Sequence, residues 1–248
     1  MKISVITVCL NSERTISHTL QSFFDQTYPH KELLVIDGGS TDQTLEIVRS
    51  FASAELRVWS QPDRGMYDAM NKGLKWFDGD AVGFLNSDDT FHDRTAIASI
   101  AAGLTAADVV YGDVIFVSDH SSKRPLRTWR AGHYHRRSFR LGWLPPHPTF
   151  YIRRELAKRV GPFDAEYGSA ADYDFMLRAM ELHYPRICYL PRTLVDFQHG
   201  GQSTASFAGY IKSNLNCLKS RQRHLRSAPV DIALFAKPLR KLHQFKWR

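Results

Sequence analysis

The chain has 248 residues, of which 43% are hydrophobic and 12% aromatic, enough to bury the core of one catalytic domain with an appendage. Its three cysteines are odd in number and far apart in sequence, which excludes a disulfide scaffold and favours a reducing compartment. No window approaches the roughly 18 apolar residues of a membrane span, and the first residues lack a signal-peptide pattern. We therefore expect a cytoplasmic protein.

The formal net charge of +8 belongs to the C-terminal end of the chain. Ten of the 33 Lys and Arg residues but one of the 25 acidic residues lie in 210–248, which leaves 23 basic and 24 acidic residues elsewhere. Because the remainder is nearly neutral, we expect no nucleic-acid partner. We define 207–248 as the basic amphipathic tail. Two interpretations of it stay open: a peripheral contact with an anionic membrane surface, or a helix that packs its apolar stripe on the body.

Strand-like and helix-like segments alternate along the first half. Helical spacing of apolar residues follows a candidate cap at Asn11 or Ser12, and a second predicted helix precedes a third over 67–77. A buried strand is predicted over 2–8, and further strands over 33–36, 56–59 and 81–85. This alternation predicts an α/β fold with a mainly parallel sheet flanked by helices. A strand over 108–117 and a hairpin around 118–125 follow, so we divide the catalytic domain, 1–206, into halves at 1–104 and 105–206.

Polar residues gather where the predicted strands end. They occupy Thr7–Glu13, Asp37–Asp42 and Asn86–Asp89. In parallel sheets ligands bind where the carboxyl ends of the strands open, so the placement nominates one shared site.

Asp88 and Asp89 follow the predicted strand 81–85 directly. A nucleotide-sugar donor has a diphosphate leaving group, and a divalent cation held by carboxylate oxygens is the usual means of stabilising its charge. The alternative is that the pair is a plain turn or helix cap before Asp93. The sequence of this segment alone leaves both interpretations open.

Four segments in the same order resemble the family 2 glycosyltransferases, which have the GT-A fold. They are Ser4–Asn11, Val35–Asp42, Asp63–Gly73 and Phe84–Asp89, and the resemblance extends over about 1–200. It is closest to members that build bacterial exopolysaccharides such as colanic acid. The resemblance implies an inverting, metal-dependent enzyme that uses Mn²⁺ or Mg²⁺. It also implies a nucleotide-sugar donor, a saccharide or lipid-linked acceptor, and a role in cell-surface polysaccharide synthesis.

The resemblance implies roles for residues of the first half. The nucleotide side comprises Thr7, Asn11, Glu13, Asp37, Gly38, Asp63 and Asp88, with Asp37 on the base. Asp37 can accept from a base N–H, and Gly38 permits close backbone approach. Arg64 can meet a phosphate. The alternative for Asp37–Asp42 is an ordinary turn stabilised by its own side chains.

The metal ligands implied by the resemblance are Asp89, Asp88 and His199. Asn86 stands where the family commonly has an aspartate, which lowers the expected metal affinity. His199 lies where relatives place a metal- or diphosphate-binding histidine, although isolated histidines are also frequently structural.

The resemblance implies that Asp172 is the catalytic base. Inverting transfer needs one carboxylate to take the proton of the acceptor hydroxyl. Asp174 can cap the helix or bind the acceptor, and His147 resembles a family position near the acceptor sugar. The alternative is that Asp172 and Asp174 only complement the dipole of a helix N-terminus.

Three rival functions would require motifs or charge patterns of their own. An NAD-dependent Rossmann enzyme requires a glycine-rich turn after the first strand, and Val8–Glu13 contains no glycine. A sugar-phosphate nucleotidyltransferase requires a glycine-rich phosphate loop with a basic residue, which is also missing. A non-catalytic membrane or nucleic-acid binding module would use the basic tail alone.

Overall fold

The computed structural model describes residues 1–118, 124–198, 207–227 and 231–234. Its first half is a parallel sheet with strand order β3-β2-β1-β4, as the alternation predicted. The strands are β1 (Ile3–Cys9), β2 (Lys31–Asp37), β3 (Leu56–Ser60) and β4 (Ala81–Phe84). Val, Ile and Leu dominate β1 and β2, which are buried along their whole length.

The second half extends the same sheet with mixed pairing. From β4 the order continues β8-β6-β9-β5, and β7 pairs with β6. Only β6 and β9 run parallel there, so the sheet is less parallel than the sequence suggested. The antiparallel β6–β7 pair confirms the predicted hairpin. The strands are β5 (Asp89–Phe91), β6 (Val109–Val117), β7 (Pro125–Trp129), β8 (Tyr151–Arg153) and β9 (Ile187–Gln198).

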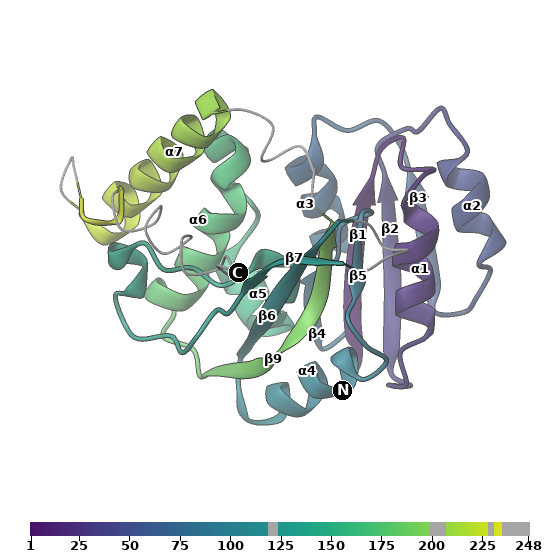
Figure 1. Ribbon diagram of the computed structural model, residues 1–248, viewed down its shortest axis with the longest axis horizontal. Coiled ribbons are helices and arrows are strands. Elements are labelled where there is room, and N and C mark those ends of the chain that lie inside the picture. The colour runs from purple at the N-terminus through teal and green to yellow at the C-terminus, as the bar shows by residue number, and fades with distance from the viewer. Residues whose placement is uncertain (119–123, 199–206, 228–230, 235–248) are drawn as a thin grey trace.

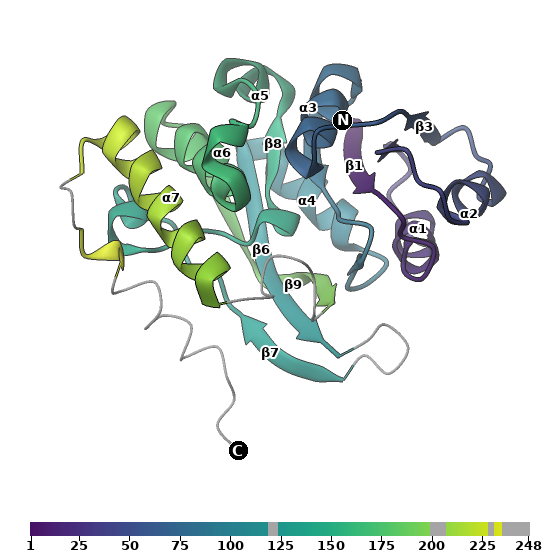
Figure 2. The same ribbon diagram turned by 90° about the horizontal axis from the view of Figure 1, so that it is seen from above.

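Helices cover both faces of the sheet, as Figures 1 and 2 show. Successive residues of β1 alternate between two cores: Val5 packs with α1, α2 and α4, and Ile6 with α3, α5 and α6. The helices are α1 (Ile16–Phe24), α2 (Thr44–Ser50), α3 (Met66–Trp76), α4 (Ala96–Ala106), α5 (Arg154–Val160) and α6 (Ala171–Leu177). Short 3-10 helices in the described residues are η1 (Ser138–Leu141), η2 (His147–Thr149) and η3 (Ala165–Ala170), and a π-helical segment, η4 (Arg178–Leu182), directly follows α6.

The start of the basic tail is a helix, α7 (Phe207–Leu225), which lies outermost against α6 and η3 (Figures 1 and 2). Cys217 and Leu218 are buried there, and Arg221 is 1% exposed. The packing interpretation therefore holds for this helix, while 235–248 lie outside the described residues. Within the described ranges, no helix has the length and apolarity needed to cross a membrane.

Candidate functional site

The register of the parallel strands brings the predicted polar segments to one edge. Cys9 pairs with Asp37, and Ile6 with Phe84, so β1, β2 and β4 end side by side. The hydroxyls of Ser12 and Ser87 lie 3.0 Å apart and join the first loop to the fourth. We call the loops 10–13, 38–44, 61–65 and 86–88, together with Asp89, the donor edge, after the donor that the sequence predicts there.

Two exposed donor-edge residues bind the neighbouring loop. Asn11 has a positive φ of 50°, and its Oδ1 accepts from the backbone N–H of Thr41 at 2.9 Å. Glu13 accepts from the backbone N–H of Gln43 at 3.0 Å. Asn11 is thus engaged outside α1, which begins at Ile16, so the predicted cap at Asn11 or Ser12 is wrong. The side chains of Asn11 and Glu13 thus connect the first loop to the second by hydrogen bonds.

Two other residues predicted on the nucleotide side are fully buried. Thr7 and Asp37 are both 0% exposed. Burial alone raises the pKa of Asp37, but hydrogen bonds from Ser40, Ser60 and two backbone N–H groups outweigh it and hold this pKa below its usual range. Asp37 therefore fixes the turn after β2, and its contact with a nucleotide base stays a prediction.

Gly38 and Asp63 approach each other closely. A Cβ added to Gly38 would lie 2.5 Å from Oδ2 of Asp63, so a larger residue there would have to displace the Asp63 carboxylate. Oδ1 of Asp63 accepts from the backbone N–H of Gly65 at 2.8 Å. Two predicted nucleotide-side residues from different loops are therefore adjacent.

The Asp88–Asp89 pair is not a helix cap. Asp89 begins β5, whose register places it opposite Phe197 of β9, and α4 starts later at Ala96. Asp89 is 0% exposed, whereas Asp88 is half-buried. Burial and the charge of Asp88 raise the pKa of Asp89 well above its usual value.

Two neutral donors hold Asp89 in place. Nδ2 of Asn86 donates to Oδ2 at 2.9 Å, and the backbone N–H of Gln198 donates to Oδ1 at 3.3 Å. An aspartate at position 86 would place another negative charge beside this buried carboxylate, so the departure from the family pattern has a local physical reason. The sequence did not indicate this contact.

The structure describes only part of the predicted metal site. His199 lies outside the described residues, although it directly follows Gln198 in sequence. Over the described ranges, no group of three or more His, Cys, Asp or Glu side chains could hold a metal ion. Asp88 and Asp89 fit the kind of site in which Mg²⁺ takes one or two carboxylates and completes its shell with substrate phosphates and water.

The candidate base lies among aromatic residues from three elements. Asp172 is half-buried in the first turn of α6. Burial raises the pKa of Tyr67, and the charge of the nearby Asp172 raises it further. The rings of Tyr67 and His147 lie 5.7 and 5.8 Å from that of Phe163. The sequence segment 63–73 was singled out, but the role of Tyr67 within it was not recognised.

His147 is 8% exposed, and its Nε2 has no hydrogen-bond partner in the described part of the chain. Its ring stacks on Phe84, with centroids 5.3 Å apart. Burial lowers its pKa and the charge of Asp172 opposes that shift, with a net lowering. The imidazole is therefore neutral at pH 7 and able to donate or accept one further hydrogen bond.

Asp174 is buried and hydrogen-bonded inside the protein, which argues against the prediction that it binds the acceptor. It is 0% exposed and accepts from Arg178 at 2.7 Å, Ser220 at 2.8 Å and His224 at 3.0 Å. Burial alone raises its pKa, but these three partners outweigh it and lower the pKa. On a helix, positions two apart point in different directions, which is why Asp172 and Asp174 diverge.

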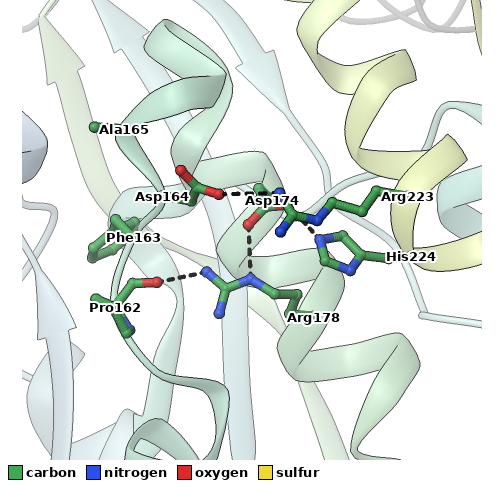
Figure 3. A pocket seen from close by; sticks show the side chains of 8 residues that line it. All are labelled: Pro162, Phe163, Asp164, Ala165, Asp174, Arg178, Arg223 and His224. Carbon is green, nitrogen blue, oxygen red and sulfur yellow. Dashed lines mark hydrogen bonds and ion pairs between the residues drawn. The ribbon is translucent and has the colours of Figure 1, made fainter.

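A cavity of about 390 Å³ lies beside this network, between the loop after α5, α6 and the end of α7 (Figure 3). Figure 3 shows its charged side chains turned toward one another: Arg178 with Asp174, and Arg223 with Asp164 at 3.6 Å. Its lining residues all come from 162–178 and 223–224. The cavity is separate from the donor edge, and its charges are mutually paired.

The fold is that of the GT-A class of glycosyltransferases, an α/β sheet with carboxylates at the ends of its parallel strands. The chain belongs to glycosyl transferase family 2, whose family model matches residues 4–161. It is therefore a glycosyltransferase, as the four sequence segments indicated.

Among its relatives is a PGL/p-HBAD biosynthesis glycosyltransferase of Mycobacterium bovis, 34% identical over 181 residues, which cover 71% of this chain and 68% of the relative. The solved structure of S. aureus TarS 1-349 in complex with UDP-GlcNAc is similar with a TM-score of 0.70 and 24% identity, over 98% of this chain and 73% of that one. The mannosyltransferase PcManGT from Pyrobaculum calidifontis in complex with GDP-Man and Mn²⁺ has a TM-score of 0.67 and 21% identity, over 96% and 69%.

Proposed function

We propose that this glycosyltransferase moves a sugar from a nucleoside-diphosphate sugar to a hydroxyl of a saccharide or lipid-linked acceptor, with inversion at the anomeric carbon. The observation that carries the proposal is the buried Asp89 beside Asp88 at the donor edge. Two solved structures with the same fold hold UDP-GlcNAc, or GDP-Man with Mn²⁺. The mycobacterial relative supports a role in the synthesis of a cell-surface glycolipid or polysaccharide.

The donor edge binds the nucleotide in this proposal. Asn11 and Glu13 hold the first two loops in one arrangement, and Gly38 and Asp63 form a close contact beside them. The buried Asp37 keeps the turn after β2 in shape. A pocket fixed before binding loses less conformational entropy when the donor enters.

Asp88 and Asp89 would hold the divalent cation, Mn²⁺ or Mg²⁺, with His199 as the third ligand that the sequence predicts. A bound cation would stabilise the negative charge of the departing nucleoside diphosphate. It would also favour the ionised form of Asp89, whose pKa is otherwise raised. Asn86 and Gln198 keep the carboxylate oriented.

Asp172 acts as the base. It takes the proton from the acceptor hydroxyl while that oxygen bonds to the anomeric carbon, and the bond from that carbon to the diphosphate breaks on the opposite face. Tyr67 positions the carboxylate, and His147, whose Nε2 has no hydrogen-bond partner among the described residues, contributes to the acceptor side. Both groups lie on the side of the sheet covered by α3 and α6.

The test is a screen of UDP- and GDP-sugars for thermal stabilisation with and without Mn²⁺, since a ligand that binds the native state raises stability by mass action. Asp172→Asn is then compared with the wild type. It should keep donor stabilisation and lose transfer by about 10²–10⁴-fold, the range of general acid–base catalysis. The absence of metal-dependent stabilisation by any nucleotide sugar would refute the proposal. Near-normal turnover by Asp172→Asn would refute the assignment of the base.

A further inference from the structure

Helix α7 has two opposite faces, and only one of them packs on the protein. The packed face buries Asn216, Cys217, Leu218, Ser220 and Arg221. Ile211 and Leu215, one turn apart, are instead 46% and 48% exposed. The tail interpretations first treated as alternatives, packing and membrane contact, are thus compatible, because they concern different faces.

The outward face of α7 is defined by Ile211, Lys212, Leu215, Lys219, Arg223 and the adjacent Arg226, all of them exposed. Between Phe207 and Leu225 the sequence has no acidic residue. Arg223, 61% exposed in its side chain, has a loose ion pair of 3.6 Å with Asp164. Arg221 does not contribute, because it is buried in an ion pair of 2.6 Å with Asp231.

We propose that the outward face of α7 binds an anionic lipid surface. Two aliphatic side chains between four cations suit the headgroup boundary, where the apolar groups enter the interface and the cations meet lipid phosphates. The apolar area is small, so binding depends on charge. In sequence, 235–248 add five Lys or Arg residues and no acid, which gives the same sign of charge on the C-terminal side.

Through its packed face, α7 forms hydrogen bonds with α6, the helix that contains the proposed base. Arg221 donates to the Tyr173 hydroxyl at 3.0 Å, and Ser220 donates to Asp174 at 2.8 Å. Both acceptors are on α6, whose first turn contains Asp172. A lipid surface on α7 would thus lie one helix layer, with axes about 8–10 Å apart, from the helix of the base. This consequence, a lipid-linked acceptor, rests on the proposed function, whereas the surface itself does not.

The experiment measures binding of the full chain to phosphatidylcholine vesicles with and without phosphatidylglycerol, in the absence of donor and acceptor. We expect binding only to the anionic vesicles and a loss of binding at high salt. Lys212→Gln/Lys219→Gln should bind about 30-fold more weakly, since each cation near an anionic surface contributes a factor of about five. Ile211→Ser/Leu215→Ser should bind about tenfold more weakly.

The matched control is Lys75→Gln/Lys158→Gln, which removes the same charge from exposed positions of α3 and α5. It should bind nearly as the wild type does. Equal losses in the two double variants, or equal binding to neutral vesicles, would overturn the proposal. So would an α7 double variant that keeps vesicle binding but loses self-association in sedimentation, because the face would then be a subunit contact. Donor stabilisation is measured separately, so failure here leaves the transferase proposal to its own test.

Discussion

Two fully buried aspartates in different regions of the protein have opposite pKa shifts. Asp89, at the donor edge, has a raised pKa, because burial and the neighbouring Asp88 outweigh its two neutral donors. Asp174, between α6 and α7, has a lowered pKa, because Arg178, Ser220 and His224 outweigh its burial. Fully buried carboxylates can therefore differ in the direction of the pKa shift: hydrogen-bond and ion-pair partners outweigh burial at Asp174, whereas the charge of Asp88 adds to the effect of burial at Asp89.

The difference indicates different tasks. The α6–α7 region is complete without a ligand and holds the tail helix to the catalytic domain. At the donor edge, a cation from outside would relieve the charge that the fold leaves uncompensated. At functional sites, such local arrangements commonly lower the stability of the folded protein. Variants that change one of these two regions at a time test the difference.

The largest effect is expected from Asp174→Ala, which removes one partner of a buried ion pair. The free energy of unfolding should fall by about 3–5 kcal/mol, because Arg178 is left without its carboxylate. Chemical denaturation measures this. The matched control is Glu155→Ala, whose ion pair with Lys158 is exposed and should contribute at most about 1 kcal/mol. Equal losses in the two variants would show that the buried network does not hold α7.

Asp89→Ala should instead leave the protein folded and impair donor binding. We expect kcat/KM to fall by about 10²–10³-fold, the scale for removing a group that stabilises transition-state charge. The Mn²⁺-dependent part of donor stabilisation should disappear. Steady-state kinetics and melting curves with and without Mn²⁺ check both points. If metal-dependent stabilisation persists at wild-type strength, Asp89 is not a metal ligand.

Asp89→Asn should have the opposite effect on stability from any change at Asp174. Replacing a disfavoured buried charge with a neutral amide should raise the free energy of unfolding without metal by about 1 kcal/mol, or about 3 °C in Tm. Excess Mn²⁺ should reverse the ranking of variant and wild type, because only the carboxylate gains from the cation. A variant less stable than the wild type in EDTA would contradict the raised pKa.

The pH dependence of stability separates the same two residues. A raised folded-state pKa means that Asp89 costs stability once pH exceeds its unfolded value, about 3.9, and increasingly so until pH passes the folded pKa. The advantage of Asp89→Asn should therefore vanish in acid and grow toward neutral pH. Asp174, with a lowered pKa, stabilises above its unfolded value, and this contribution is lost as pH falls through the folded pKa. Denaturation curves across the acid range test both signs.

The two regions also differ in how much of their structure could be predicted from the sequence. The alternation of apolar strands and helices was enough for the parallel half, and strand ends were enough to bring Asn11, Gly38 and Asp88 to one edge. These inferences work because they depend on local periodicity and on one general property of parallel sheets. The antiparallel insertion of β8 between β4 and β6 has no such local signal, so the sheet is mixed where a mainly parallel one was expected.

The sequence could not predict which polar side chains are buried. Asp174 looked available for an acceptor until α7, some 46 positions further along, supplied Ser220 and His224. Thr7 and Asp37 lie at a strand end as predicted but are covered on all sides. Such contacts depend on long-range packing, which a pattern within one segment does not record.

The smallest effect is expected from Tyr67→Phe, which removes a hydroxyl that we propose positions Asp172. Its removal should reduce kcat by about 2–10-fold, the effect of losing one hydrogen-bonding group worth about 0.5–1.5 kcal/mol, and leave donor-induced stabilisation unchanged. The KM for the donor should stay at the wild-type value. A structural role alone would lower Tm without this selective loss of kcat. Comparison with Tyr28→Phe, whose hydroxyl donates to the carbonyl of Met1 far from α6, separates the two cases.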